Sequence, residues 1–236
     1  MRTLLVILAH PDDESFPIGG TLAKYAAQGV RVVLVSATRG EAGIPGLTPE
    51  SAGEIRMREL LQAARTLGVS EVRFLGYRDG ELALADSKTV QAQVADLICE
   101  IQPQAVITFG PDGVSGHPDH IAIHRIVTRA FDQVQPAACL YYIAPSEATL
   151  QGCGVVPPPH RAGRSVVAVD VAAHLLTKVR AAHCHTSQHP PFAGPPDEQA
   201  AHMACHEHFT LARPRQAPAS FSDLFAPALD AWADVG

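Results

Sequence analysis

Two loops of the chain combine histidine, proline and aspartate, which are residue types that could hold a metal ion and move protons. The first loop, Ala9 to Glu14, reads Ala-His-Pro-Asp-Asp-Glu, and the second, His117 to His120, reads His-Pro-Asp-His. Imidazole nitrogen and carboxylate oxygen both suit zinc, and a catalytic zinc takes three protein ligands and a water. The first loop could also be an acidic cap on the next helix, because carboxylates stabilise helix N-termini. For metal binding it needs another ligand from elsewhere in the chain, and the second loop can supply one.

Each loop follows a short apolar run that predicts a buried strand, at 3–8 and at 105–109. Such unbroken runs are typical of central strands of a parallel sheet. Open α/β sheets bind their ligands beside the carboxyl ends of their strands, so we expect both loops to meet at one edge. One histidine of the second loop would then bind metal and the other would be free for chemistry. His124, one turn after His120, is a competing ligand that we interpret as a helix-surface or packing histidine.

Strands and helices alternate along the chain, which predicts right-handed crossovers between parallel strands. We therefore expect a Rossmann-like α/β fold, a three-layer sandwich with a mainly parallel sheet and the active site at the carboxyl ends of the strands. The glycines after the first strand do not form the dinucleotide fingerprint, which disfavours a nucleotide-dependent oxidoreductase. The apolar and helical patterns predict strands at 3–8, 31–36, 71–75, 105–109, 140–143 and 165–169, and helices at 18–28, 49–67, 89–101, 121–131, 170–185 and 198–211.

The length of 236 residues is enough for one α/β domain, which we expect to span 1–236. Phe221, Leu224, Phe225, Leu229 and Trp232 recur at helical spacing and predict a tail helix over about 212–236. The Pro- and Gly-rich stretch 145–164 is a candidate lid or rim of the site.

Composition excludes several other classes of protein. The net charge of −6, with no basic stripe, argues against a nucleic-acid partner. The first apolar run is too short to span a membrane and lacks a cleavage site. The 5 cysteines are scattered without a CxxC pair, which indicates a reducing, cytoplasmic location. Histidines and cysteines after position 180 match no zinc module, and we interpret them as surface residues.

Spacing alone gives Arg56, Glu59 and Asp79 no function. Arg56 and Glu59 stand three residues apart in a predicted helix, where a solvated pair worth ~0.2–0.5 kcal/mol would explain them. Asp79 precedes Gly80, and Asp-Gly is a turn signal in its own right.

With both loops in view, the chain resembles the LmbE-like (PIG-L) family of zinc-dependent N-deacetylases. The resemblance covers most of the chain. It rests on residues 9–14, 38–43, Arg56 with Glu59, 67–69, 77–80 and 116–120, and later on Asp170, Lys178 and 185–188.

The resemblance implies a division of roles between the two loops. His10, Asp13 and His120 would bind zinc, with ferrous iron as an alternative metal. Asp12 would be the general base on the attacking water. His117 would stabilise or protonate the tetrahedral intermediate, and either Asp12 or His117 could protonate the leaving amine.

Further roles follow from the same resemblance. Asp119 would orient a histidine, which is a usual duty of a carboxylate beside a metal site. Arg56 and Asp79 would hold sugar hydroxyls. Some family members have a tyrosine just before the glycine of the second loop, but here that position is Ser115.

The implied function is removal of acetyl from an N-acetylglucosamine-type substrate, favouring a glucosaminyl conjugate in low-molecular-weight thiol biosynthesis. A thiol-conjugate amidase, or a deacetylase of antibiotic or nucleoside metabolism, is the alternative within the class. A non-catalytic metal-binding domain is disfavoured, because Asp12 and His117 remain beside the ligands. We expect a small-molecule amidosugar substrate, a homo-oligomer in the cytoplasm, and neither nucleic acid nor membrane as partner.

Overall fold

The computed structural model describes residues 1–145, 166–188, 194–213 and 220–225 of the chain. The described strands form one eight-stranded sheet in the order β3-β2-β1-β4-β5-β7-β6-β8. Neighbours from β3 through β5 are parallel, whereas β7 runs antiparallel to both β5 and β6. The strands are β1 (Thr3–Leu8), β2 (Arg31–Ser36), β3 (Glu71–Phe74), β4 (Ala105–Phe109), β5 (Cys139–Ile143), β6 (Val166–Asp170), β7 (His206–Arg213) and β8 (Ser220–Phe221).

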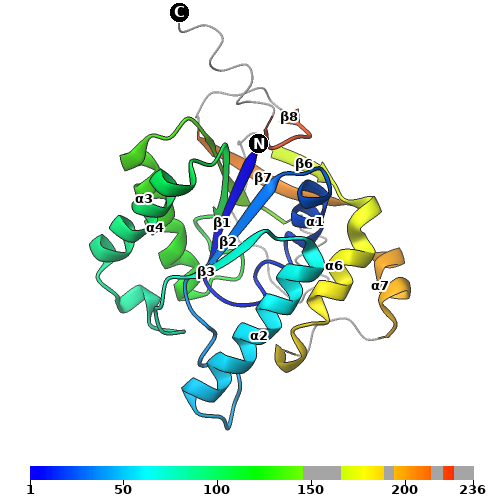
Figure 1. Ribbon diagram of the computed structural model, residues 1–236, viewed down its shortest axis with the longest axis horizontal. Coiled ribbons are helices and arrows are strands. Elements are labelled where there is room, and N and C mark those ends of the chain that lie inside the picture. Colours follow the sequence, from blue (N-terminus) through cyan, green and yellow to red (C-terminus); the bar gives the residue numbers. More distant parts are fainter. Residues whose placement is uncertain (146–165, 189–193, 214–219, 226–236) are drawn as a thin grey trace, which may run out of the picture.

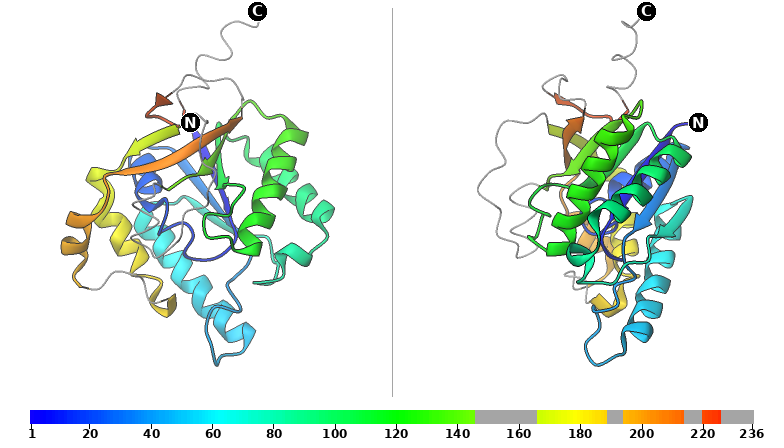
Figure 2. Two further views of the ribbon diagram at one scale, coloured as in Figure 1. Left: turned by 180° about the vertical axis from the view of Figure 1, so that it is seen from behind. Right: turned by 90° about the vertical axis from the view of Figure 1, so that its left-hand side faces the viewer.

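Two groups of helices lie on opposite sides of the strands in Figure 1, and the same separation is visible from behind in Figure 2. One group pairs α3 (Ser87–Ile101) with α4 (Pro118–Val134), and the other packs α1 (Gly19–Ala27), α2 (Pro49–Leu67), α6 (Leu175–Ala182) and α7 (Pro196–His202) together. Short 3-10 turns are η1 (Leu82–Leu84), η2 (Ala172–His174) and η3 (Thr186–Gln188). The predicted three-layer α/β sandwich with a mainly parallel sheet is confirmed. No helix in the described part of the chain is long and apolar enough to cross a membrane.

Local signals set several element boundaries. Every residue of β1 and β4 is buried, as expected for central strands covered on both faces. Helix α2 has the predicted bounds, because Thr48 caps it and Gly68 ends it in the left-handed conformation at φ 77°. Helix α4 starts earlier than predicted, at Pro118, since the His117 side chain caps it by accepting the N–H of Asp119.

The prediction for the C-terminal part of the chain is wrong in two places. The helix predicted over 198–211 stops at His202, and His206–Arg213 forms β7 instead. The tail helix predicted from about 212 is contradicted by residues 212–213, which end β7, and by residues 220–221, which form β8. A strand forms here because the antiparallel β7 fills the gap between β5 and β6. The rest of the tail, 226–236, and the candidate lid, 146–164, lie outside the described residues.

A buried ion pair ties β7 to the helix that follows the first loop. The Glu207 carboxylate accepts the backbone N–H groups of Gly20 at 3.0 Å and Thr21 at 2.7 Å, and so caps the N-terminus of α1. Lys178 of α6 lies 2.6 Å from the same carboxylate, and both side chains are buried. The start of α1 is therefore held by elements near the C-terminus.

Candidate metal centre

The two loops meet where β1 and β4 end side by side, and their side chains converge. The Nδ1 atom of His10 lies 3.1 Å from Nε2 of His120, which is 3.3 Å from Oδ1 of Asp13. The other carboxylate oxygen of Asp13 lies 3.7 Å from Nδ1 of His10. Tetrahedral ligands about 2.0–2.2 Å from a zinc ion stand about 3.3–3.6 Å apart, and the His10–His120 and His120–Asp13 distances are close to this range.

In each of the two histidines, the ring nitrogen that points away from the other histidine has its own hydrogen-bond partner. Nδ1 of His120 lies 3.0 Å from the carbonyl of Gly113 and donates to it. Nε2 of His10 lies 3.0 Å from Asp79 and 3.2 Å from Asp119. In the neutral ring that a metal ligand needs, a proton on each of these outer nitrogens would leave the lone pair on the inner one.

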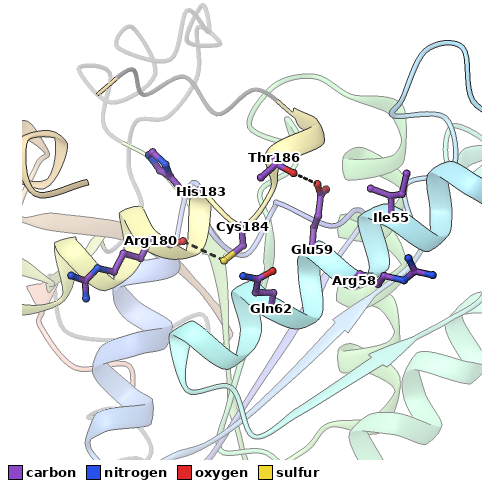
Figure 3. Close-up of a pocket in the computed structure, with 8 residues that line it drawn as sticks. All are labelled: Ile55, Arg58, Glu59, Gln62, Arg180, His183, Cys184 and Thr186. Carbon is purple, nitrogen blue, oxygen red and sulfur yellow. Dashed lines mark hydrogen bonds between the residues drawn. The ribbon is translucent and has the colours of Figure 1, made fainter. Parts of the chain in front are cut away.

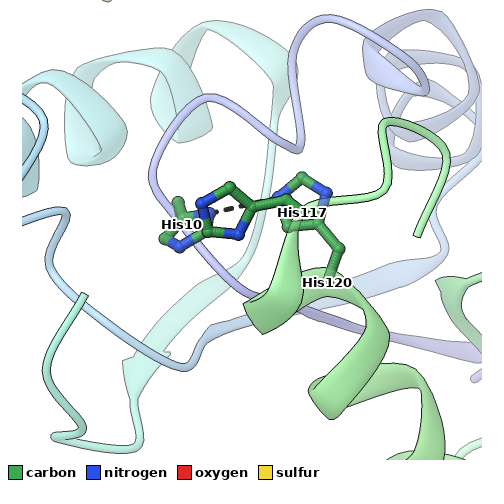
Figure 4. A group of neighbouring side chains, drawn as sticks. All are labelled: His10, His117 and His120. Carbon is green, nitrogen blue, oxygen red and sulfur yellow. Dashed lines mark hydrogen bonds between the residues drawn. The ribbon is translucent and has the colours of Figure 1, made fainter. Parts of the chain in front are cut away.

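Two groups of three donor residues in the described part of the chain have ligand atoms within 4.8 Å of one another, and neither group includes Asp13. The first is His10, His117 and His120, whose rings gather at the start of α4 in Figure 4. The Nδ1 atom of His117 accepts the Asp119 N–H at 3.2 Å, so Nε2 is the ring nitrogen that remains for a metal or a substrate. The second group, His10 with Asp79 and Asp119, uses the outer nitrogen of His10, so its carboxylates orient that ring.

Opposite charges decide the pKa values of the three central donors. Burial lowers the pKa of His10, but hydrogen bonds to Asp119 and Asp79 and the charge of Asp13 outweigh it and raise the pKa to about 10. Burial would raise the pKa of Asp13, but His120 and His10 hold it below its usual range. The His120 pKa is also raised, because the charge of Asp13 outweighs burial. The pKa of His117 is lowered by burial and by the charges of His10 and His120, so this ring is neutral at neutral pH.

Asp12 stands outside the set of three donors, and its backbone explains why. Its φ is 104°, a left-handed value that a residue with a side chain rarely adopts and that costs about 1–3 kcal/mol. Oδ2 of Asp12 lies 3.0 Å from Nη2 of Arg56. Burial and the neighbouring charge of Asp13 raise the pKa of the Asp12 carboxyl to about 7, although Arg56 opposes the shift. The two adjacent aspartates therefore have opposite pKa shifts.

Arg56 reaches Asp12 by passing between two glycines. Its guanidinium also donates to the carbonyl of Pro11 at 2.5 Å, and only 5% of its side chain is exposed. A Cβ added at Gly40 or at Gly43 would collide with this guanidinium. The solvated Arg56–Glu59 pair that spacing favours is therefore wrong.

Glu59 instead ties α2 to the segment after α6. Its carboxylate accepts the Thr186 hydroxyl at 2.8 Å and the Ser187 hydroxyl at 2.7 Å. Figure 3 shows the bond to Thr186 beside a groove of about 450 Å³ between α2 and α6. The charged ends of Arg58 and Arg180 point away from each other there, so they do not form a joint anion site. Sequence reasoning missed this role of Glu59, because the partners are more than 120 residues apart.

Other predicted residues are placed as follows. His124 is buried against the sheet, with Nδ1 2.8 Å from the carbonyl of Phe109 and its ring beside Tyr142, so it is a packing histidine and not one of the helix surface. Ser115 lies 3.4 Å from Nδ1 of His120. The late histidines and cysteines form no group of three donors among the described residues, but His185 is fully buried, so its interpretation as a surface residue is wrong.

The sequence matches the family model of PIG-L, described as GlcNAc-PI de-N-acetylase, over residues 5–131. The chain belongs to the PIG-L family. The match includes both loops of the metal centre and Arg56, but it ends before β5 and the segment that binds Glu59.

Relatives of this PIG-L family member are named 1D-myo-inositol 2-acetamido-2-deoxy-alpha-D-glucopyranoside deacetylase. The relative from Acidothermus cellulolyticus is 41% identical over 169 residues, 61% of this chain and 58% of the relative. The relative from Saccharomonospora viridis is 34% identical over 226 residues, 78% of this chain and 84% of the relative. The chain spans between 44% and 58% of the length of the first four relatives it matches.

Among solved structures, N,N'-diacetylchitobiose deacetylase from Pyrococcus horikoshii is 28% identical, with a TM-score of 0.61 over 80% of this chain and 71% of that one. Its likeness extends the comparison beyond the residues matched by the family model.

We predict one divalent metal ion per chain, bound by His10, Asp13 and His120. Asp13→Asn and His120→Ala should weaken metal affinity by at least ~10-fold, because each removes a ligand, whereas His117→Ala should retain it. His124→Ala, on the same helix but outside the donor set, is the matched control. Elemental analysis measures the number of metal ions per chain, and calorimetric titration measures the metal affinity. Loss of metal in His117→Ala with retention in Asp13→Asn would mean that His117, and not Asp13, is the third ligand.

We also predict that Gly43→Ala destabilises the protein by ~1–3 kcal/mol, since the added methyl group collides with the Arg56 guanidinium. In an Arg56→Ala background the same change should cost much less. Urea unfolding of the two single variants, the double variant and the wild type gives the coupling free energy. An equal cost in both backgrounds would mean that Gly43 is not there to make room for Arg56.

Proposed function

We propose that the protein is a zinc-dependent hydrolase that removes acetyl from an N-acetylglucosamine-type substrate, with ferrous iron as the alternative metal. The main support is the Asp12 carboxylate, which Arg56 contacts at 3.0 Å and which does not belong to the set of His10, Asp13 and His120. Burial raises its pKa to about 7. The chemistry needs such a group, because a general base works best when its pKa lies near the operating pH. The names of the relatives and of the Pyrococcus enzyme, which all specify acetylated amino sugars, support this substrate class.

His10, Asp13 and His120 would hold the cation, which when bound supplies a water acidified to a pKa of about 7. Asp12 would then accept the proton of the attacking water. Arg56 keeps the Asp12 carboxylate in place through the 3.0 Å contact between Nη2 and Oδ2. Removal of such a base typically lowers the rate by ~10²–10⁴-fold.

His117 would donate a hydrogen bond to the oxygen that becomes negative as the amide carbonyl is attacked. Its Nδ1 accepts the Asp119 N–H, so the proton of the neutral ring is on Nε2, which would be the donor. Burial lowers the pKa of this ring, which suits a hydrogen-bond donor better than a source of a proton for the leaving amine. Asp12, protonated after its first step, is the better general acid.

Arg56 and Asp79 would act first as positioning residues. Arg56 holds Asp12, and Asp79 contacts His10 while accepting the Ala42 N–H at 3.1 Å. Their side chains are only 5% and 9% exposed, which leaves little surface for a sugar. Contact with sugar hydroxyls stays a prediction, as do the cytoplasmic location, the homo-oligomer and the favoured thiol-biosynthesis conjugate.

A panel of substrates tests the proposal. N-Acetylglucosaminyl conjugates with inositol, lipid, sugar and antibiotic aglycones, together with a thiol-conjugate amide, are incubated with protein of measured metal content. We expect equimolar release of acetate and primary amine from at least one acetylated glucosaminyl conjugate, and loss of the activity after chelation. Hydrolysis of the thiol conjugate alone would replace the deacetylase by an amidase.

A second prediction separates Asp12 from Asp13. Asp12→Asn should retain metal and fold, because the amide is isosteric, but lose ~10²–10⁴-fold in kcat. Asp13→Asn should lose metal, and excess metal should restore part of its activity. Rates and metal content are measured on the same preparations. A wild-type kcat in Asp12→Asn would remove Asp12 from the mechanism and leave His117 as the candidate base.

A further inference from the structure

The first loop contains a third acid, Glu14, whose carboxylate is fully buried. One of its oxygens, Oε2, accepts the backbone N–H of Asp12 at 3.0 Å. The other, Oε1, accepts the hydroxyl of Ser15 and lies 2.7 Å from Nε2 of His185. The carboxylate therefore connects the backbone of Asp12 to a histidine 171 residues further along the chain.

The bond from Glu14 acts on the strained part of the loop. Asp12 has a φ of 104°, and such a conformation persists only where the surroundings hold it. Both ends of the peptide group between Pro11 and Asp12 are held: Arg56 donates to its carbonyl at 2.5 Å, and Glu14 accepts its N–H. Fixing this peptide fixes the direction in which the Asp12 side chain leaves the backbone.

His185 is itself rigidly placed. It is fully buried just after α6, and the next two residues, Thr186 and Ser187, are bonded to Glu59 of α2. The Nε2 contact with Glu14 is the one hydrogen bond of its ring among the described residues, because Nδ1 has no partner there. Helix α2 also carries Arg56, so both supports of the peptide are anchored to one helix.

We propose that His185 is a positioning residue for the reaction: it holds Glu14, and Glu14 holds the peptide that aims Asp12. The part of this inference that concerns catalysis rests on the proposed function, because it takes Asp12 as the base. His185 lies outside residues 5–131, so the residue that would hold the first loop belongs to a segment beyond the family match.

The first experiment needs no substrate. Amide hydrogen exchange at Asp12 is followed by NMR in the wild type, in His185→Phe, which removes the donor, and in His185→Gln, which keeps a donor near the position of Nε2. Lys178→Met is the matched control, since it breaks another buried ion pair of α6 that touches Glu207 and not Glu14. We expect exchange at Asp12 to be at least ~10-fold faster in His185→Phe, and within ~3-fold of wild type in the other two. Unchanged exchange in His185→Phe, or an equal rise in Lys178→Met, would overturn the proposal.

If His185→Phe does not fold because Glu14 is left as an unpaired buried charge, Glu14→Gln/His185→Phe removes that charge. The same rise in exchange at Asp12 is expected in this double variant. Wild-type exchange in it would equally overturn the proposal.

The second experiment uses the best substrate of the panel. His185→Phe should lower kcat by ~10–100-fold with KM and metal content unchanged, and His185→Gln should restore most of the rate. In an Asp12→Asn background His185→Phe should change the residual kcat by less than ~3-fold, because the group it positions is already absent. A full additional loss there would show that His185 acts on the fold in general. If no substrate is found, the function proposal fails while the exchange result still decides whether His185 holds Asp12.

Discussion

The pairing of β1 with β4 is the constraint on which the site depends. Leu4, Leu5 and Val6 stand beside Ala105, Val106 and Ile107 in parallel register, so both strands end at the same edge of the sheet. The other neighbour of β1 is β2, which means that the chain leaves β1 in one direction and returns on its other side. Such a reversal opens a crevice between the loops that follow the two strands. It brings His10 and His120, which are 110 residues apart, to 3.1 Å.

This crevice concentrates charge that neither loop could bury alone. Buried charges are tolerated when each has a partner, and here every carboxylate of the site has one. Asp13 lies beside His120, Asp12 beside Arg56, and Asp79 and Asp119 beside His10. Because these partners are fixed by the sheet and by α2, the dipoles and charges are already oriented toward the metal centre. Fixed orientation is what electrostatic catalysis requires, since no reorganisation remains to be done during the reaction.

Most of the parallel half of the fold could be predicted from the sequence, and the antiparallel part could not. The runs at 3–8, 31–36 and 105–109 are short, apolar and flanked by clear helix signals, so local patterns set their bounds correctly. Strand β7 follows a segment whose Glu-Gln-Ala-Ala composition favours a helix, and its strand conformation comes from pairing with β5 and β6. Burial of Glu207, Phe209 and Leu211 follows the alternation that could have revealed it. The same holds for the site. The residue types that could bind a metal were predictable from the sequence, but the path of Arg56 between Gly40 and Gly43 was not, because it depends on three-dimensional packing.

Asp12 and Asp13 show why residue type alone does not decide a role in this site. The two side chains are chemically identical and adjacent, yet the Asp13 carboxylate turns back to accept the N–H of His10 at 2.7 Å and so joins the donors. Asp12 is directed elsewhere by a backbone φ of 104°, beside a peptide group that Arg56 and Glu14 both hold by hydrogen bonds. The different surroundings then move the two pKa values in opposite directions. Backbone strain at one residue thus converts a pair of like acids into one that can hold a cation and one that can accept a proton.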